Sequence, residues 1–193
     1  MKNYLLLLAL SGACLSTPGL HAQISTWKID PGNSSVSFQV RHLGISTVRG
    51  TISGVQGTIE LDQKDITKSS VDANAESATV NTGNDNRDKH LKSDEFFDVA
   101  KNPKLSFKST SLTNTGGKLQ LTGELTLAGI TKTVTLDLDG PSAPQTDRGV
   151  TKSGFSATGT LSRKAFNFGQ SSPLNAAIGD EINFTIDVEI DKQ

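Results

Sequence analysis

The chain has 193 residues, with 19 Lys and Arg, 20 Asp and Glu, and a net charge of −1. This balance argues against a nucleic-acid-binding protein, which usually carries a strongly basic surface. The chain has no block of like charges of the kind that predicts binding to a membrane surface. The single cysteine, Cys14, has no partner for a disulfide or a cysteine-ligated metal site.

The first 22 residues are typical of a cleavable secretory signal peptide. Lys2 precedes an apolar run at residues 5–10, and small residues lead up to Ala22. This run is far shorter than the roughly 20 residues of a membrane-spanning helix. We therefore predict export to a bacterial periplasm, with one domain at residues 23–193. Lipidation at Cys14 is a weaker alternative, because no aliphatic residue stands three positions before it.

Alternating apolar and polar residues predict β-strands along most of the remaining chain. The apolar members of the successive strands are Val36, Phe38 and Val40; Ile52, Ile59 and Leu61; Val71, Ala73 and Ala75; Leu119, Leu121, Leu125 and Leu127; Val134, Leu136 and Leu138; Phe155, Ala157 and Leu161; and Ile182, Phe184, Ile186, Val188 and Ile190. Turn-forming residues separate these runs at 31–33, 114–117 and 141–149. Such a series predicts an all-β sandwich or barrel, and the pattern alone does not distinguish them.

Residues 81–109 interrupt the alternation with clustered charges and few β-branched residues. A short helix is predicted near residues 84–93, because Thr82 or Asn84 can cap it and Asp85 falls in the favourable first turn. Pro103 ends the segment, and the alternation resumes with Phe107.

Motifs in a fixed order give the chain a family resemblance. They read FQVRHLG at 38–44, RDKHLKS at 87–93 with EFFD at 95–98, and IGDEI at 178–182. This ordered set resembles the YceI-like family of polyisoprenoid-binding periplasmic proteins. The resemblance implies a lipocalin-like, eight-stranded antiparallel β-barrel that encloses a long apolar chain. One departure lies near Arg163, where Ala165 replaces a frequently acidic residue, and we expect Arg163 to stack or pair with Phe166 or Phe168.

The same resemblance identifies candidate ligand-binding residues. The apolar candidates are Phe38, Val40, Ile52, Phe107, Leu121, Leu136, Phe155, Phe184 and Ile186. Without the resemblance, these residues would be interpreted as an ordinary filled core. Arg41, His42 and Arg49 bracket the first connection between strands and are candidates for an anionic head group, since Arg offers paired donors to phosphate. The alternative interpretation is that Arg41, His42 and Arg49 are ordinary charged surface residues beside a turn.

One group of polar residues resembles catalytic machinery. Arg87, Asp88, His90 and Asp94 share a helical face, which is typical either of a general base or of a solvated helix with ion pairs. No nucleophile accompanies them. His42 and His90 lack metal-ligand spacing, so neither a metal nor a cofactor is predicted.

The predicted function is therefore a non-enzymatic carrier or storage protein for a long-chain isoprenoid or similar lipid. We expect no nucleic-acid partner and no transmembrane segment, and the resemblance leaves a homodimer open. Two alternatives remain at this stage: an enzyme that acts on such a lipid with His90 or His42 as base, and a filled barrel that serves as a stress-related protein-interaction module.

Overall fold

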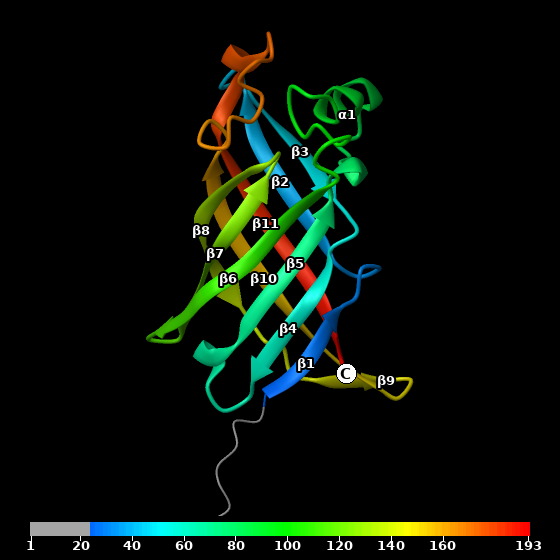
Figure 1. Ribbon diagram of the computed structural model, residues 1–193, viewed down its shortest axis with the longest axis vertical. Coiled ribbons are helices and arrows are strands. Elements are labelled where there is room, and N and C mark those ends of the chain that lie inside the picture. The colour runs from blue at the N-terminus through cyan, green and yellow to red at the C-terminus, as the bar shows by residue number, and fades with distance from the viewer. Residues whose placement is uncertain (1–23) are drawn as a thin grey trace, which may run out of the picture.

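The computed structural model describes residues 24–193, so the predicted signal peptide and its cleavage site lie outside the described residues. Antiparallel strands form one continuous sheet (Figure 1). They are β1 (Ile24–Ile29), β2 (Ser35–His42), β3 (Ser46–Ile52), β4 (Gln56–Asp62), β5 (Ser70–Glu76), β6 (Lys104–Thr115), β7 (Lys118–Leu127), β8 (Ile130–Asp139), β9 (Gln145–Asp147), β10 (Val150–Ser162) and β11 (Ile178–Lys192).

The sheet closes where β10 meets β11. Their pairing runs without a break from Lys152 opposite Asp191 to Ser162 opposite Glu181. The closed ring contains eight strands in the order β11, β1, β4, β5, β6, β7, β8 and β10. Strands β2 and β3 extend the wall beside β11, and β9 is appended to β10. The prediction of an eight-stranded antiparallel barrel is therefore confirmed.

Short helices connect the strands. The single α-helix of the described chain, α1 (Asp85–Leu91), begins at Asn84, whose side chain accepts a hydrogen bond from the Arg87 N–H at 3.0 Å. This agrees with the predicted helix and with one of its two predicted caps. Three short 3₁₀ helices are η1 (Ile66–Lys68), η2 (Ser77–Thr79) and η3 (Asn175–Ala177). Within residues 24–193 no helix has both the length and the apolar character that crossing a membrane requires.

Three features of the strand pattern differ from the prediction. Strand β9 lies within residues 141–149, which were predicted as a turn. Strand β1 was not predicted, because only Trp27 and Ile29 in it are buried and the run is too short for a clear alternation. The apolar residues Ile52 and Ile59, which were assigned to one strand region, belong to β3 and β4. The chain bends between them at Gly54, whose φ of 70° favours glycine, in agreement with the bend or bulge that Gly54 and Gly57 predict from the sequence.

The two ends of the barrel are closed in different ways. At the lower end in Figure 1, Trp27 and Ile190 are 2% and 0% exposed and seal the interior between β1 and β11. At the upper end, the wall gives way to the segment around α1 and to the loop at residues 163–177 (Figure 1). Side chains from these two segments, and not the sheet itself, cover the interior at this end.

Candidate functional site

The barrel contains an apolar cavity of about 200 Å³. Inward-facing side chains of the strands form its wall, and nearly all of them are apolar. Eight of the nine predicted apolar residues line it: Phe38, Ile52, Phe107, Leu121, Leu136, Phe155, Phe184 and Ile186. Val40 does not; it is half-buried between Val48 and Ile182, close to an irregularity in the pairing of β2 with β11.

Three of the lining phenylalanines lie against glycines of neighbouring strands, which keeps their rings close to the wall. The pairs are Phe38 with Gly50, Phe184 with Gly159, and Phe107 with Gly123. A β-carbon placed on these glycines would lie 2.5, 2.7 and 2.5 Å, respectively, from the terminal ring carbon. No side chain larger than hydrogen therefore fits beneath the rings, and the space along the barrel axis stays open. The sequence shows the glycines, but the pairing depends on strand register.

Two segments that pack on each other cover the upper end of the cavity. Leu91, the last residue of α1, and Phe97 line the cavity from one segment, and Phe168 lines it from the other. The rings of Phe97 and Phe168 meet edge to face at a centroid distance of 4.8 Å. The Gly169 N–H donates to the Glu95 carbonyl at 3.0 Å and joins the two backbones. We call residues 91–97 and 163–177 together the lid.

A histidine–carboxylate pair supports the lid from outside the cavity. His90 Nε2 lies 2.5 Å from Glu95 Oε2, and the His90 ring packs edge-on against Phe96 at 5.0 Å. The hydrogen bond from His90, followed by one from Ser172 in the other lid segment, lowers the pKa of Glu95 below its ordinary value. Glu95 therefore links both halves of the lid.

The other members of the helical polar group have local structural contacts. Arg87 donates to the Thr82 hydroxyl and carbonyl at 2.8 and 2.9 Å. Asp88 accepts from the Thr82 N–H at 2.9 Å and from its hydroxyl. Asp94 is exposed. The group does not converge on a shared reaction centre; it fastens α1 to the preceding turn, and neither His42 nor His90 lines the cavity.

The three predicted cationic residues also lie outside the cavity. Arg41 is exposed, and its guanidinium donates to the carbonyls of Gly44 and Ile45 at 2.6 and 3.0 Å, so it braces its own turn. His42 is half-buried where β2 meets Ile178 of β11. Arg49 borders a polar groove on the outer surface of the barrel. The structure therefore does not bring these residues together into one anion-binding site.

Arg163 is the organising residue of the loop at 163–177. Its side chain is 1% exposed and donates to the carbonyls of Gly179, Phe168, Asn175 and Ile178 at 2.8–3.1 Å. Burial lowers the pKa of Arg163, and the charge of the nearby Asp180 opposes this shift. We expected Arg163 to stack or pair with aromatic rings, but it donates hydrogen bonds to backbone carbonyls instead. Most of these carbonyls are more than ten residues away along the chain, so the sequence does not predict them as partners.

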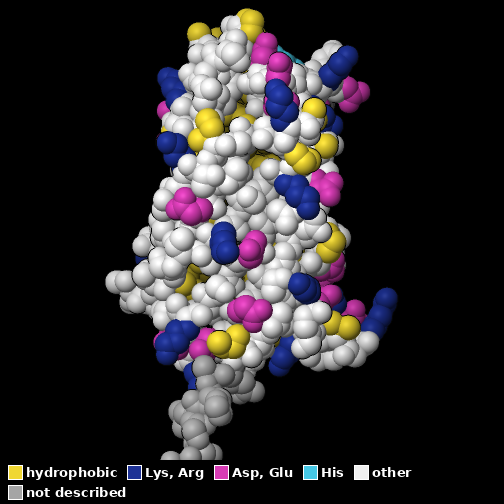
Figure 2. Space-filling model, in the orientation of Figure 1, with side chains coloured by type: hydrophobic (Ala, Val, Ile, Leu, Met, Phe, Trp, Pro, Cys, Tyr) yellow, Lys and Arg dark blue, Asp and Glu magenta, His cyan; other side chains and the backbone are white. Residues whose placement is uncertain are grey.

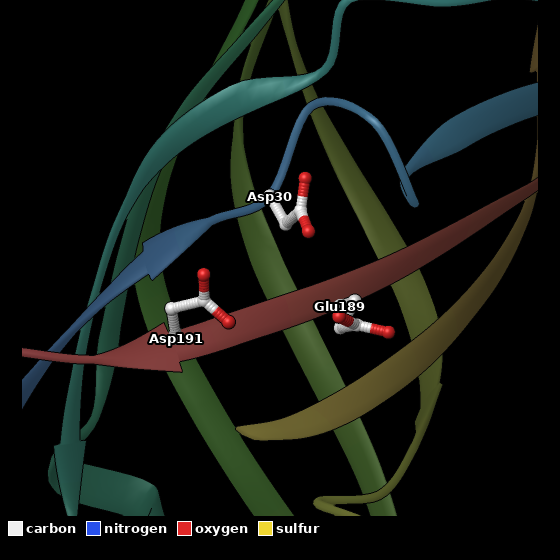
Figure 3. Close-up of side chains that lie close together, drawn as sticks. All are labelled: Asp30, Glu189 and Asp191. Carbon is white, nitrogen blue, oxygen red and sulfur yellow. The ribbon is translucent and has the colours of Figure 1, made fainter. Parts of the chain in front are cut away.

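A cluster of carboxylates lies at the lower end of the barrel. Asp30, Glu189 and Asp191 turn their oxygens toward a common point (Figure 3), within 4.8 Å of one another. The ammonium group of Lys152 occupies this point, at 3.7, 2.8 and 2.7 Å from the three carboxylates. The protein thus supplies its own cation, and the cluster links β1, β10 and β11 where the sheet closes.

Comparison with known proteins places the chain in a family. Residues 27–190 match the YceI-like domain. Protein YceI of Salmonella arizonae is 36% identical over 191 residues, which cover 98% of this chain and 97% of that protein.

Solved structures show the same architecture. A Campylobacter jejuni YceI protein is 32% identical, with a TM-score of 0.68 over 79% of this chain and 90% of that one. A polyisoprenoid-binding domain from Saccharophagus degradans shares the fold, with a TM-score of 0.61 and 13% identity over 86% of this chain and 98% of that one. The chain belongs to the YceI-like family.

Proposed function

We propose that this protein is an exported carrier or storage protein that binds the apolar chain of an isoprenoid or similar lipid inside the barrel. The observation that carries the proposal is the cavity itself, whose wall is apolar along its length and three of whose phenylalanine rings lie close against glycines of neighbouring strands. Burial of a hydrocarbon chain in such a space contributes roughly 25 cal/mol per Å² of apolar surface, less the free energy of ordering the chain.

Family membership and fold likeness support the same class of ligand. The family resembles binding proteins more than enzymes, and a protein with this fold is described as a polyisoprenoid-binding domain. The polar groups of the present chain are consistent with binding, because the most enzyme-like of them, Arg87, Asp88 and His90, are engaged in bonds that shape the lid region.

The volume of the cavity limits the length of chain that fits. A cavity of about 200 Å³ accommodates only part of a long polyprenyl chain. A longer polyprenyl chain would have to extend beyond the upper end, because Trp27 and Ile190 seal the lower one.

Mass spectrometry tests this proposal directly. Native spectra of the purified protein should contain a lipid adduct, and organic extraction should release a molecule with an aliphatic or isoprenoid chain. Refilling the delipidated protein with a series of prenyl alcohols should give an affinity that rises with chain length and then levels off. A protein that stays empty throughout the series would contradict the proposal and favour a filled barrel.

Export is the second element of the proposal, and it depends on residues outside the described structure. N-terminal sequencing of the protein from the periplasmic fraction should begin at Gln23. A lipid-modified N-terminus at Cys14 would instead indicate the alternative class of signal.

A further inference from the structure

The two ends of the cavity differ in what must move before a lipid chain can pass. At the lower end, Trp27 and Ile190 belong to paired strands, opposite Ile59 and Ser153 respectively. Passage there would break several hydrogen bonds between strands. At the upper end, the two segments of the lid lie outside the sheet and project separately from it (Figure 1). The upper end is therefore the easier one to open.

One half of the lid, the loop at residues 163–177, is fastened to the wall. The buried guanidinium of Arg163 donates to the carbonyls of Phe168, Asn175 and Ile178 at 2.8–3.1 Å. These bonds tie the middle and the end of the loop to the start of β11. Displacing the loop would leave buried donors of Arg163 without partners, which is strongly unfavourable. This half of the lid therefore stays in place.

The other half is attached to the wall at two points that lie close together. We call residues 83–101 the flap. Before the flap, Asn81 pairs with Thr51 of β3 through two backbone hydrogen bonds of 2.8 and 3.0 Å. After it, the Asn102 carbonyl accepts from the Ser77 hydroxyl at 2.7 Å. Because Ser77 and Asn81 flank the short helix η2, the two attachment points form a common base.

The flap has a fixed end and a free end. At the start of α1, Arg87 donates to the Thr82 hydroxyl and carbonyl, beside the base. At the free end, the Glu95 carbonyl accepts from the Gly169 N–H at 3.0 Å, and the Glu95 carboxylate is bonded by Ser172. Among residues 24–193, these are the only two hydrogen bonds that the flap makes beyond its base, and both go to the fixed loop.

Apolar packing completes the contact between flap and loop. Phe96 and Phe97 of the flap both meet the Phe168 ring edge to face, at centroid distances of 5.4 and 4.8 Å. We call this contact the seam. Hydrophobic side chains are visible at the surface of the upper part of the molecule, where these segments lie (Figure 2). Apolar contacts are non-directional, so a hydrocarbon chain between the rings replaces the contacts that they lose.

We propose that the flap opens by pivoting on its base, and that the seam is the port through which a lipid chain enters and leaves the cavity. This inference rests on the proposed function and adds the route of exchange to it. A chain longer than the cavity would pass through the seam and hold the flap partly open, with its polar end outside the apolar wall.

Exchange kinetics test the port. The probe is N-phenyl-1-naphthylamine, a neutral apolar dye whose binding is followed by fluorescence and which farnesol should displace. Glu95→Gln weakens the bonds at the free end of the flap without changing the lining of the cavity. It should raise the association and dissociation rate constants by the same factor, roughly threefold or more, because a hydrogen bond to a charged group is stronger than one to a neutral amide by about this factor. The Kd should change little.

Ser25→Ala is the matched control at the lower end. The Ser25 hydroxyl accepts from Trp27 Nε1–H at 2.9 Å, so this variant also loses one side-chain bond at an end of the cavity. Both of its rate constants should equal those of the wild type. Faster exchange in Ser25→Ala than in Glu95→Gln would move the port to the lower end and overturn the inference. So would a Glu95→Gln variant in which only dissociation is faster, because Glu95 would then act on the bound state and not on passage.

Hydrogen exchange of the Gly169 amide measures the motion of the flap without a dye. This amide bonds the Glu95 carbonyl across the seam, so each opening exposes it to water. In the ligand-free protein, its protection factor should be lower than those of the amides that pair β10 with β11. Protection should be weaker with bound solanesol, a much longer prenyl alcohol, than with bound farnesol.

The same measurement separates failure of the port from failure of the proposed function. Protection of the Gly169 amide equal to that of the β10–β11 amides would show that the flap stays closed, and would overturn the inference even if lipid binds. A wild-type protein that binds neither dye nor farnesol would overturn the proposed function and the port that rests on it, while a weakly protected Gly169 amide would still identify the motion of the flap.

Discussion

At the scale of single residues, the cavity exists because glycine lies beneath phenylalanine. Phe184 and Gly159 face each other directly across β11 and β10, as do Phe38 and Gly50 across β2 and β3. An aromatic ring over a glycine in a neighbouring strand restores the packing that the glycine lacks. The ring lies against the glycine of the neighbouring strand, and the lumen beside it is left for a ligand.

The variant Gly159→Ala should therefore reduce the capacity of the cavity. Its β-carbon would come within 2.7 Å of both the Phe184 ring and a methyl group of Leu136, so the ring must swing into the lumen. We expect that the longest prenyl alcohol that the variant binds is shorter than the longest that the wild type binds, as measured by native mass spectrometry. The stability cost should be at the low end of the roughly 1–3 kcal/mol typical of overpacking, because an empty space receives the ring.

Truncation of the ring provides the matched test. Phe184→Ala and Phe38→Ala should lower lipid occupancy, yet destabilise the delipidated protein by less than the roughly 3–5 kcal/mol of a filled core. In the double variant Phe184→Ala/Gly159→Ala, the added methyl group should no longer shorten the bound chain. Thr158→Ala, which faces outward, serves as control. Normal lipid binding with a loss of several kcal/mol would identify these rings as ordinary core.

At the scale of elements, the lid consists of two segments that lie outside the barrel wall and are bonded to each other. Glu95 connects them through its carbonyl, which accepts from Gly169, and through its carboxylate, which binds His90 and Ser172. A carboxyl group whose pKa is lowered on folding stabilises the folded state above its ordinary pKa. That contribution is lost as the pH falls through the lowered value. The joint should therefore be strongest near neutral pH and weaken in acid.

The variant Glu95→Gln should loosen the lid at neutral pH. We expect a smaller hydrogen-exchange protection factor for the Gly169 amide, with little change in the strands of the ring. The difference from the wild type should shrink as the pH falls below the ordinary glutamate value of 4.5 and vanish below the lowered pKa, where the folded wild-type carboxyl group is also protonated. Asp94→Asn is the matched control on the exposed neighbour. An equal effect of both variants would refute a specific role for Glu95.

At the scale of the whole molecule, closure of the barrel concentrates charge at one place. Pairing of β10 with β11 brings Lys152 opposite Asp191, and the end of β1 adds Asp30. The hydrogen bonds that Lys152 donates to Asp191 and then to Glu189 raise the pKa of Lys152, so its ammonium is charged at neutral pH. The lysine offsets the repulsion among three carboxylates that the closed fold imposes.

Removal of this cation should expose the repulsion. Lys152→Met is expected to unfold at a lower denaturant concentration at pH 7, with a smaller loss in acid as the carboxylates become protonated. Added Ca²⁺ should stabilise the variant and not the wild type, because oxygen ligands then surround an uncompensated site. Lys118→Met at the exposed start of β7 is the control. Identical midpoints for wild type and Lys152→Met would contradict this account of the closure.

The sequence by itself determined the local structure of this protein. Alternation places Phe38, Phe107, Phe155 and Phe184 on the apolar faces of their strands, because successive side chains in a strand point to opposite sides. Thr82 or Asn84 predicts the start of α1 to within two residues, because capping depends on residues only a few positions apart, and the structure shows that Asn84 is the cap. The order of motifs indicated the family and, through it, the choice of a barrel over a sandwich.

Only the tertiary structure decided which of these residues meet. The glycines beneath the phenylalanines depend on register between strands, and the bonds of Arg163 and Lys152 join residues that are separated along the chain. Arg41 and Arg49 are near one another in the sequence, yet neither reaches the cavity, since both lie on the outward face of the wall. The alternation of apolar and polar residues assigns each side chain to one face of its own strand. Which side chains of other strands it contacts depends on how the sheet closes, and closure pairs residues that are far apart along the chain.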